Sequence, residues 1–234
     1  MSNYDVLVVS AHPDDAEMNI GGTLIKLCEA GLSLFHLALT AGQFGTYGEP
    51  ASRKIEFQAA LDFLGAKGRI LSHLDTELEH TIEIRRGVAG LIRELRPKVI
   101  FAPYHSNPVA ERGGIAHTDH FTAGAIVRDA AKLARLKGVQ LPHAPHEVKR
   151  LYFFMMPTFS KPHVVVDVSD KIDQTMALIR CYSSQLSITR NSLGIEEILR
   201  TKRASLGIDV GTGYAEGLLV DEPLHFSARN FIEL

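Results

Sequence analysis

The sequence predicts an α/β protein, a Rossmann-like three-layer α/β/α domain built around a mostly parallel sheet. Short β-branched runs alternate with longer helical segments along most of the chain, which is the pattern that βαβ units produce. Several of the helical segments stop at a glycine or just before a proline. Because strands joined by helices run parallel, helices are expected to cover both faces of the sheet.

The first part of the chain gives four strand and helix pairs. An apolar, β-branched run opens the chain and stops at a turn, and Gly31 closes the helix that follows. Gly65 and Pro97 mark the ends of the next two helices. The strands are expected at residues 6–10, 32–40, 69–74 and 98–102, and the helices at residues 18–30, 52–64, 82–95 and 121–136. A long loop without periodicity, residues 103–117, precedes the fourth helix, and loops of that length often carry function.

The second part continues the alternation less regularly. Two further strands are expected at residues 151–156 and 164–168, followed by a helix that Ser169 or Asp170 can cap and that reaches residue 182. A last helix covers residues 195–206 and stops at Gly207. Without a linker or repeat, the length predicts one domain, residues 1–234.

Charge and cysteine content restrict the possible partners. The chain has 25 Lys and Arg residues against 27 Asp and Glu residues, so it has no overall basic field to hold nucleic acid or an anionic membrane. No apolar run approaches the roughly 18 residues of a membrane span. The two cysteines, Cys28 and Cys181, suit a reducing compartment. A cytoplasmic protein with a small-molecule partner is the expectation.

A cluster of polar residues follows the first strand. Residues 11–17 read Ala-His-Pro-Asp-Asp-Ala-Glu, which places them at the strand's carboxyl end, where open α/β sheets bind ligands. Across a turn, His12 and Asp15 can converge on one cation while Asp14 points elsewhere. Zinc accepts such a mixture of nitrogen and oxygen ligands. Taken alone, the acids can equally well cap the following helix.

A second cluster, His117-Thr-Asp-His120, follows the fourth strand. Alone, the His-x-x-His spacing is a weak signal, since either histidine could be an ordinary surface residue. If the alternation of strands and helices holds, both clusters lie at the same edge of the sheet. Their combination favours a metal site.

The two clusters resemble the signature of the LmbE-like, or PIG-L, family of zinc-dependent N-acetylglucosaminyl deacetylases, an AHPDD-x-E segment with a later H-x-D-H. Similar segments follow in family order at Arg53-Lys-Ile-Glu56, Tyr182-Ser-Ser-Gln185 and Gly213-Tyr-Ala-Glu-Gly217. Within the family, residues 153–156, 161–162 and 166–169 look closest to the deacetylases of bacillithiol synthesis. The resemblance implies removal of an N-acetyl group from an N-acetylglucosamine-containing small molecule, such as N-acetylglucosaminyl malate.

Carried over by position, the resemblance implies a catalytic metal site. His12, Asp15 and His120 would hold Zn²⁺ and leave a fourth position open, as in catalytic zinc sites. The same ligands also accept Fe²⁺. Asp14 matches the family's general base, which takes a proton from the attacking water. Relatives often form hexamers or smaller rings, so a homo-oligomer is expected.

The resemblance also gives roles to residues around the metal. His117, as a cation, would stabilise the oxyanion, with Asp119 holding its ring. Arg53 matches a position that contacts substrate. Without the resemblance, Arg53 is as readily interpreted as a helix-surface arginine. Glu17 can orient a ligand from behind or can simply be a first-turn glutamate.

Some positions depart from the family pattern. Thr118 stands where the family has proline, and it can act as a helix cap. Isoleucines, Ile115 and Ile195, stand where some relatives have a tyrosine near the oxyanion. Tyr47 and Tyr104, on neighbouring loops, could replace it. The loop of residues 42–48 has the composition of a rim loop that can shape the sugar pocket.

Other classes of function fit less well. A nucleotide-binding oxidoreductase needs a glycine-rich phosphate turn after the first strand, where this chain has carboxylates that repel phosphate. Serine or cysteine hydrolases need a nucleophile beside a histidine, and the chain has no G-x-S-x-G segment. A catalytically silent metal- or sugar-binding protein on the same fold is the remaining alternative, against which the retention of Asp14 argues.

Overall fold

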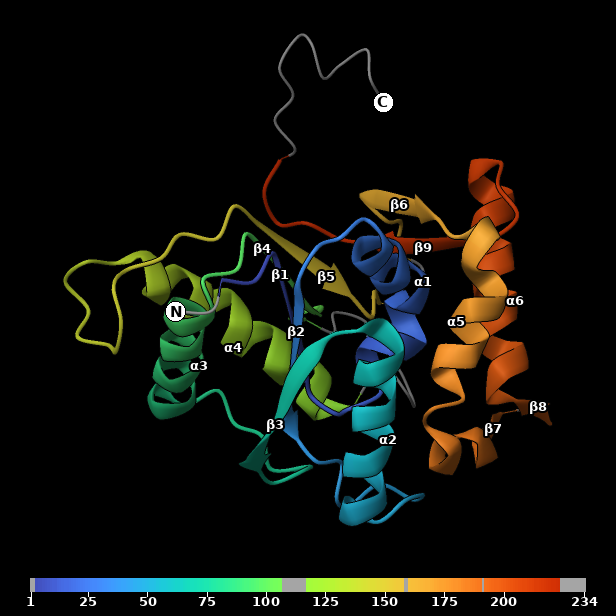
Figure 1. Ribbon diagram of the computed structural model, residues 1–234, viewed down its shortest axis with the longest axis horizontal. Coiled ribbons are helices and arrows are strands. Elements are labelled where there is room, and N and C mark those ends of the chain that lie inside the picture. Colours follow the sequence, from blue (N-terminus) through green and yellow to red (C-terminus); the bar gives the residue numbers. More distant parts are fainter. Residues whose placement is uncertain (1–2, 107–116, 158–159, 191, 224–234) are drawn as a thin grey trace, which may run out of the picture.

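A five-stranded parallel sheet in the order β3-β2-β1-β4-β5 forms the centre of the structure, a computed structural model that describes residues 3–106, 117–157, 160–190 and 192–223 (Figure 1). Its strands are β1 (Val6–Ser10), β2 (Leu34–Thr40), β3 (Lys67–His73), β4 (Val99–Pro103) and β5 (Arg150–Phe154). All residues of β1 and β2 are buried, as expected for central parallel strands with helices on both faces. β1 pairs with β2 on one side and with β4 on the other. Strands β2 and β3 therefore extend the sheet in one direction from β1, and strands β4 and β5 extend it in the opposite direction.

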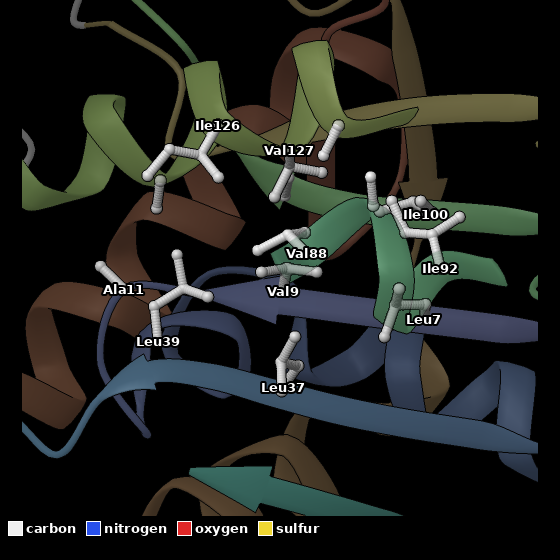
Figure 2. Close-up of a cluster of buried hydrophobic side chains, with 14 of the residues drawn as sticks. Leu7, Val9, Ala11, Leu37, Leu39, Val88, Ile92, Ile100, Ile126 and Val127 are labelled. Carbon is white, nitrogen blue, oxygen red and sulfur yellow. The ribbon is translucent and has the colours of Figure 1, made fainter. Parts of the chain in front are cut away.

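Helices cover both faces of this sheet, which confirms the predicted three-layer α/β fold. The helices nearest the sheet are α1 (Asp15–Glu29), α2 (Pro50–Leu64), α3 (Ile82–Leu95) and α4 (Thr118–Arg135). In Figure 1, α3 and α4 lie on one side of the sheet, and α1 and α2 lie on the other. Figure 2 shows Leu7 and Val9 of β1 pointing toward Val88 of α3 and Val127 of α4. These contacts form one of two large cores, and the second lies under α1 and α2.

The last third of the chain builds a smaller layer beside α1. The strands here are β6 (Val164–Asp167), β7 (Thr189–Arg190), β8 (Leu193–Gly194) and β9 (Ala215–Leu218), and the helices are η2 (Ser169–Lys171), α5 (Ile172–Ile179), η3 (Ser183–Ser187) and α6 (Ile195–Val210). β6 pairs antiparallel with β9, outside the central sheet. The strand expected at residues 164–168 is therefore present, but it lies outside the parallel sheet. Its β-branched run predicts a strand, but the partner comes from about fifty residues later in the chain.

Several element boundaries also differ from the predictions. α1 begins at Asp15 and α4 at Thr118, three residues earlier than expected in each case, so both polar clusters enter the first turns of helices. α6 continues past Gly207 to Val210, and Gly211 ends it in the left-handed conformation. A Cβ at position 207 would lie 2.7 Å from the carbonyl oxygen of Gly213, so this glycine permits the backbone that follows α6 to pack closely against the helix. In the described part of the chain, no helix has the length and apolarity to cross a membrane.

A buried ion pair between Arg203 and Glu216 forms hydrogen bonds with backbone groups on both sides of a break in α1. Ile20 has non-helical dihedral angles, which interrupts the hydrogen bonding of the helix. Glu216 of β9 accepts hydrogen bonds from the backbone N–H groups of Gly22 and Thr23, at 3.0 and 2.7 Å. Arg203 of α6 pairs with Glu216 at 2.8 Å and donates to the carbonyl of Met18 at 3.0 Å. Both sides of the break are thus satisfied, which gives the Gly213–Gly217 motif a structural role.

Candidate metal centre and active site

The two His/Asp clusters meet at the carboxyl edge of the central sheet. The first lies in the turn between β1 and α1, and the second lies at the start of α4, which follows β4 in the chain. Since β1 and β4 are neighbours at the point where the strand order reverses, the turns that follow them share one crevice. The predicted juxtaposition of the clusters is therefore present.

Three atoms in this crevice have the spacing of metal ligands. His12 Nδ1 lies 3.5 Å from Asp15 Oδ1 and 3.1 Å from His120 Nε2, and the latter two atoms are 3.1 Å apart. A tetrahedral zinc site with bonds of 2.0–2.1 Å keeps its ligand atoms about 3.3 Å apart. All three residues are buried. This donor set, two imidazoles and one carboxylate, fits Zn²⁺ or Fe²⁺.

Other donor combinations also exist at the site. One nitrogen from each of His12, His117 and His120 lies within 4.8 Å of the others, and the same holds for ligand atoms of a set formed by His12, Asp75, His117 and Asp119. For the combination of His12, Asp15 and His120, all three distances between ligand atoms lie between 3.1 and 3.5 Å, which is the spacing that a tetrahedral site requires.

The charge distribution of the cluster suits a cation. Burial lowers the pKa of His12, but the carboxylates of Asp15, Asp119 and Asp75 outweigh it and raise that pKa to about 12. Burial raises the pKa of Asp15, yet His120 and His12 hold it well below its usual range. In the metal-free protein a proton on His12 supplies the positive charge that these carboxylates require. A divalent metal ion can replace that proton.

Asp15 and Asp14 do not cap α1 with their side chains. Asp15 Oδ2 accepts a hydrogen bond from His12 N at 2.8 Å, which closes the turn and leaves Oδ1 facing His120. Asp14 occupies the N-cap position without a side-chain capping bond. Its Oδ1 instead accepts from Arg53 Nη2 at 2.6 Å. Burial raises the pKa of Asp14, and the Arg53 charge opposes this rise.

Arg53 is enclosed beneath the rim loop, residues 42–48. Only 3% of Arg53 is exposed, and a Cβ at Gly42 or Gly48 would lie 3.0 or 3.2 Å from its side chain. Both glycines have positive φ, which favours glycine there. The partner that the structure gives to this guanidinium is Asp14, whereas the sequence resemblance implied a contact with substrate.

His117 caps α4 and is expected to be neutral. Its Nδ1 accepts a hydrogen bond from Asp119 N at 3.3 Å, so the ring hydrogen belongs on Nε2. Burial lowers the pKa of His117, and the positive charges of His12 and His120 lower it further. The sequence resemblance implied a cationic ring at this position instead. The hydrogen-bond geometry also shows that His117, and not Thr118, is the N-cap residue of the helix.

The Asp119 carboxylate lies elsewhere than expected. Its Oδ2 accepts from Thr76 N at 2.8 Å and lies 3.8 Å from His12 Nε2. Its Oδ1 is buried and has no hydrogen-bond partner among the described residues. In the described residues the carboxylate makes no hydrogen bond to the His117 ring, and its partner is the backbone after β3.

Asp75 is a site residue that the sequence reasoning missed. It follows β3 and is 2% exposed, with Oδ1 lying 2.9 Å from His12 Nε2. Its side chain belongs to none of the recognised motifs. The available signal was its position, because the carboxyl end of β3 belongs to the same sheet edge as those of β1 and β4.

The Tyr182–Gln185 motif supports the site from behind. The Tyr182 hydroxyl donates to the Pro13 carbonyl at 2.6 Å, inside the turn that carries His12 and Asp15. Ser184 donates through its backbone N and its Oγ to Glu56 of α2, both at 2.7 Å. Gln185 Nε2 donates to the carbonyl of Tyr47 in the rim loop, also at 2.7 Å. One short segment thus fixes the turn, the helix that carries Arg53, and the loop.

Glu17 is connected to the same turn by polar contacts through the side chains of His36 and Ser10. Its Oε1 lies 3.1 Å from His36 Nδ1, and His36 Nε2 lies 2.9 Å from Ser10 Oγ. Ser10 Oγ then donates to the His12 carbonyl at 2.6 Å. Glu17 therefore supports the backbone of His12 and does not contact a ligand side chain. His36 had been given no role from sequence.

The structure describes three of the four residues considered for the family's oxyanion tyrosine. Ile195 is the first residue of α6 and packs against the small core formed by α5 and α6. Ile115 lies outside the described residues. Tyr104 packs against Phe153, with ring centroids 5.9 Å apart, and the Tyr47 side chain is 40% exposed. Within the described ranges, neither tyrosine makes a side-chain hydrogen bond to the cluster.

The fold and the cluster define an α/β protein with a His/Asp metal-type site at the carboxyl edge of a parallel sheet. The family described as GlcNAc-PI de-N-acetylase, PIG-L, matches residues 7–131. A diacetylchitobiose deacetylase from Thermococcus kodakarensis is 31% identical over 226 residues, covering 91% of this chain and 81% of its own length. The chain therefore belongs to the PIG-L family of deacetylases, which are hydrolases of amide bonds, as its motifs predicted.

Two further similarities describe the range of relatives. A probable N-acetyl-α-D-glucosaminyl L-malate deacetylase from Bacillus anthracis is 26% identical and covers 78% of this chain and 81% of its own. The crystal structure of the conserved protein TT1542 from Thermus thermophilus has a TM-score of 0.83 at 33% identity, over 96% of this chain and 98% of that one. The deacetylases from Thermococcus kodakarensis and Bacillus anthracis are named for different amino sugars, so the narrower resemblance to bacillithiol enzymes stays a prediction.

Proposed function

We propose that this chain uses one Zn²⁺ ion to hydrolyse the N-acetyl group of a small molecule that contains N-acetylglucosamine. The observation that carries the proposal is the triangle of His12 Nδ1, Asp15 Oδ1 and His120 Nε2, with sides of 3.1 to 3.5 Å. When bound there, zinc supplies a Lewis acid for the amide carbonyl and for water, whose pKa it lowers to about 7. Family membership supports deacetylation as the reaction.

Asp14 serves as the general base in this proposal. Its carboxylate is next to the metal ligand Asp15 in the chain but is turned onto Arg53. Burial raises its pKa, which makes the carboxylate a stronger base than an exposed aspartate. It takes a proton from the water that attacks the acetamide carbon and returns that proton to the departing nitrogen. The C–N bond breaks, and acetate and a free amine are released.

His117 contributes to the same step as a neutral hydrogen-bond donor. With Nδ1 occupied by Asp119 N, its Nε2–H is available to the oxyanion that forms on the carbonyl. The proposal therefore differs from the sequence expectation in the charge of this residue. Asp119 fixes the backbone of Thr76 beside the site and is not required to move a proton.

Arg53 shapes the expected substrate preference. Because its guanidinium is paired with Asp14 and buried, its charge is already compensated. It offers little attraction to an anionic group on the sugar, so it does not favour a malate conjugate over a neutral saccharide. N,N′-diacetylchitobiose and N-acetylglucosaminyl malate are the two substrates to compare, since each belongs by name to a relative.

The proposed function is tested with zinc-loaded protein and its Asp14→Ala variant. Amine release is measured on N-acetylglucosamine, N,N′-diacetylchitobiose and N-acetylglucosaminyl malate, together with metal content. We expect release from at least one substrate and a variant that keeps its metal but loses activity by several hundred-fold or more. Wild-type protein that binds metal and releases no amine would instead support a silent metal- or sugar-binding protein.

A cytoplasmic location and a homo-oligomer, up to a hexamer, stay predictions.

A further inference from the structure

Asp75 makes the shortest polar contact of His12 on the side away from the ligand triangle. Its Oδ1 lies 2.9 Å from His12 Nε2, while His12 Nδ1 faces Asp15 and His120. The two ring nitrogens therefore have different partners. A histidine that ligates through Nδ1 must keep its hydrogen on Nε2, and a carboxylate at 2.9 Å holds that hydrogen in place.

Asp119 is the competing acceptor for the same hydrogen. Its Oδ2 lies 3.8 Å from His12 Nε2, too far for a direct hydrogen bond. The same oxygen already accepts from Thr76 N at 2.8 Å. Asp75 is therefore the carboxylate that orients the His12 ring by a hydrogen bond. Asp119 interacts with the ring only through its negative charge.

The second oxygen of Asp75 reaches the rim loop. Phe44 N donates to Asp75 Oδ2 at 3.0 Å, and the Phe44 side chain is 59% exposed. One buried carboxylate thus joins a metal ligand to the backbone of a loop that borders the site. Since the two oxygens have separate partners, the two contacts can be removed separately.

The backbone after Asp75 is held in an unusual conformation. Thr76 has φ of 66°, a left-handed conformation that is rare and strained for a β-branched residue. In this conformation the Thr76 N–H points to Asp119, while the preceding carboxylate reaches His12 and Phe44. A strained residue that directs two adjacent groups into one site suggests a functional placement.

We propose that Asp75 is a positioning residue with two functions. Oδ1 keeps the Nε2 hydrogen of His12 in place, so that Nδ1 is presented to the metal, and Oδ2 fixes the rim loop through Phe44 N. The inference rests on the proposed function, because it takes His12 Nδ1 as a metal ligand. No motif of the chain includes this residue.

Asp75→Asn and Asp75→Ala separate the two functions. In Asp75→Asn the amide oxygen can still accept from Phe44 N, but the amide nitrogen then faces His12 Nε2 and cannot accept its hydrogen. In Asp75→Ala both contacts are lost. Glu77→Gln is the matched control, because Glu77 lies exposed in the same loop and loses the same charge.

Three measurements are made on these proteins. We expect zinc affinity, from competition with a chelator, to fall 10- to 100-fold in both Asp75 variants and to stay at the wild-type value in Glu77→Gln. The slowly exchanging His12 Nε2–H resonance of the zinc-loaded protein should disappear in both Asp75 variants. Hydrogen exchange at Phe44 N should accelerate in Asp75→Ala and stay slow in Asp75→Asn.

The outcomes separate this inference from the proposed function. Wild-type protein that binds zinc and deacetylates, with Asp75 variants that match it in affinity and in the His12 resonance, would overturn the inference alone. Loss of the resonance in Asp119→Asn but not in Asp75→Asn would assign the orienting role to Asp119 and overturn it as well. Wild-type protein that binds no zinc would overturn both proposals.

Discussion

At the scale of single residues, His12 determines how the site responds to pH. Three carboxylates surround its imidazole and raise its pKa to about 12 despite burial, so the metal-free protein carries a proton where a metal ligand must be unprotonated. A metal ion therefore competes with a proton for His12 Nδ1. The same negative surroundings that favour a cation also make its binding dependent on pH.

Zinc affinity is accordingly expected to rise by about tenfold per pH unit between pH 6 and pH 8, since each bound ion displaces one proton. The measurement is a competition titration against a chelator of known pH dependence at three pH values. An affinity that does not change with pH would show that His12 is neutral before the metal binds.

Arg53 is expected to adjust the basicity of Asp14. Burial raises the pKa of Asp14, and the Arg53 charge opposes that rise, so Arg53→Met should raise the pKa further. A general base works only when ionised, and the acidic limb of kcat/KM against pH should therefore move to higher pH. Arg53→Lys, which keeps a positive charge, should move it less. An unchanged limb would indicate that Asp14 is not the base.

Some residues of the site could be predicted from the sequence, and others could not. The motif residues His12, Asp15 and His120 were predicted as one set and lie together. Asp75 was missed, because its one signal was its position after β3, and every residue of that turn shares this position. The hydrogen bonds of Asp119 could not be predicted either, since they depend on the Thr76 backbone, which sequence spacing does not specify.

At the scale of elements, the local sequence pattern predicted most strands and helix ends, whereas the pairing of strands distant in sequence was not predicted. The continuous apolar runs of β1 and β2 predicted buried parallel strands, and the glycines after the helices predicted their ends. The antiparallel pair of β6 and β9 was missed, because the run at β9 includes Glu216 and Gly217 and its partner is distant in sequence. The helix starts were placed too late because the polar first turns resembled loops.

A substitution at Tyr182 tests whether the segment after α5 stabilises the turn between β1 and α1. Tyr182→Phe removes the hydroxyl that donates to the Pro13 carbonyl and leaves that buried acceptor without its partner. We expect a loss of about 1–3 kcal/mol in the free energy of unfolding, measured by urea denaturation, and weaker zinc binding. Tyr152→Phe is the control, since Tyr152 is half-buried on β5 and no hydrogen bond of its hydroxyl is seen among the described residues. Equal losses in both variants would contradict a specific support.

At the scale of the whole molecule, the site is assembled from strands far apart in the sequence. The turns after β1, β3 and β4 supply His12, Asp75 and the start of α4, and the segment after α5 holds the first of these turns. The order of the strands was not specified by the sequence pattern. The fold class was, because the alternation of strands and helices leaves few arrangements that bury both faces of the sheet.

The stability of the metal-free molecule should pass through a maximum set by this cluster. The raised pKa of His12 stabilises the fold below its ordinary value of 6.5, and this contribution declines as pH rises toward about 12. The lowered pKa of Asp75 stabilises the fold above 3.8, and this contribution is lost as pH falls toward about 2. Thermal unfolding of metal-free protein should therefore show a contribution that is greatest between about pH 4 and 6.5. Replacement of His12 by Gln should remove the decline above that range, and an unchanged decline would contradict this origin.

The most direct test of the central claim is an anomalous difference map at the zinc absorption edge, from crystals of the zinc-loaded protein. The account predicts one peak per chain at 2.0–2.2 Å from His12 Nδ1, Asp15 Oδ1 and His120 Nε2, with Asp14 outside bonding distance. A peak bound by His117 in place of Asp15, a peak bound through His12 Nε2, or the absence of any peak at this edge of the sheet would contradict it.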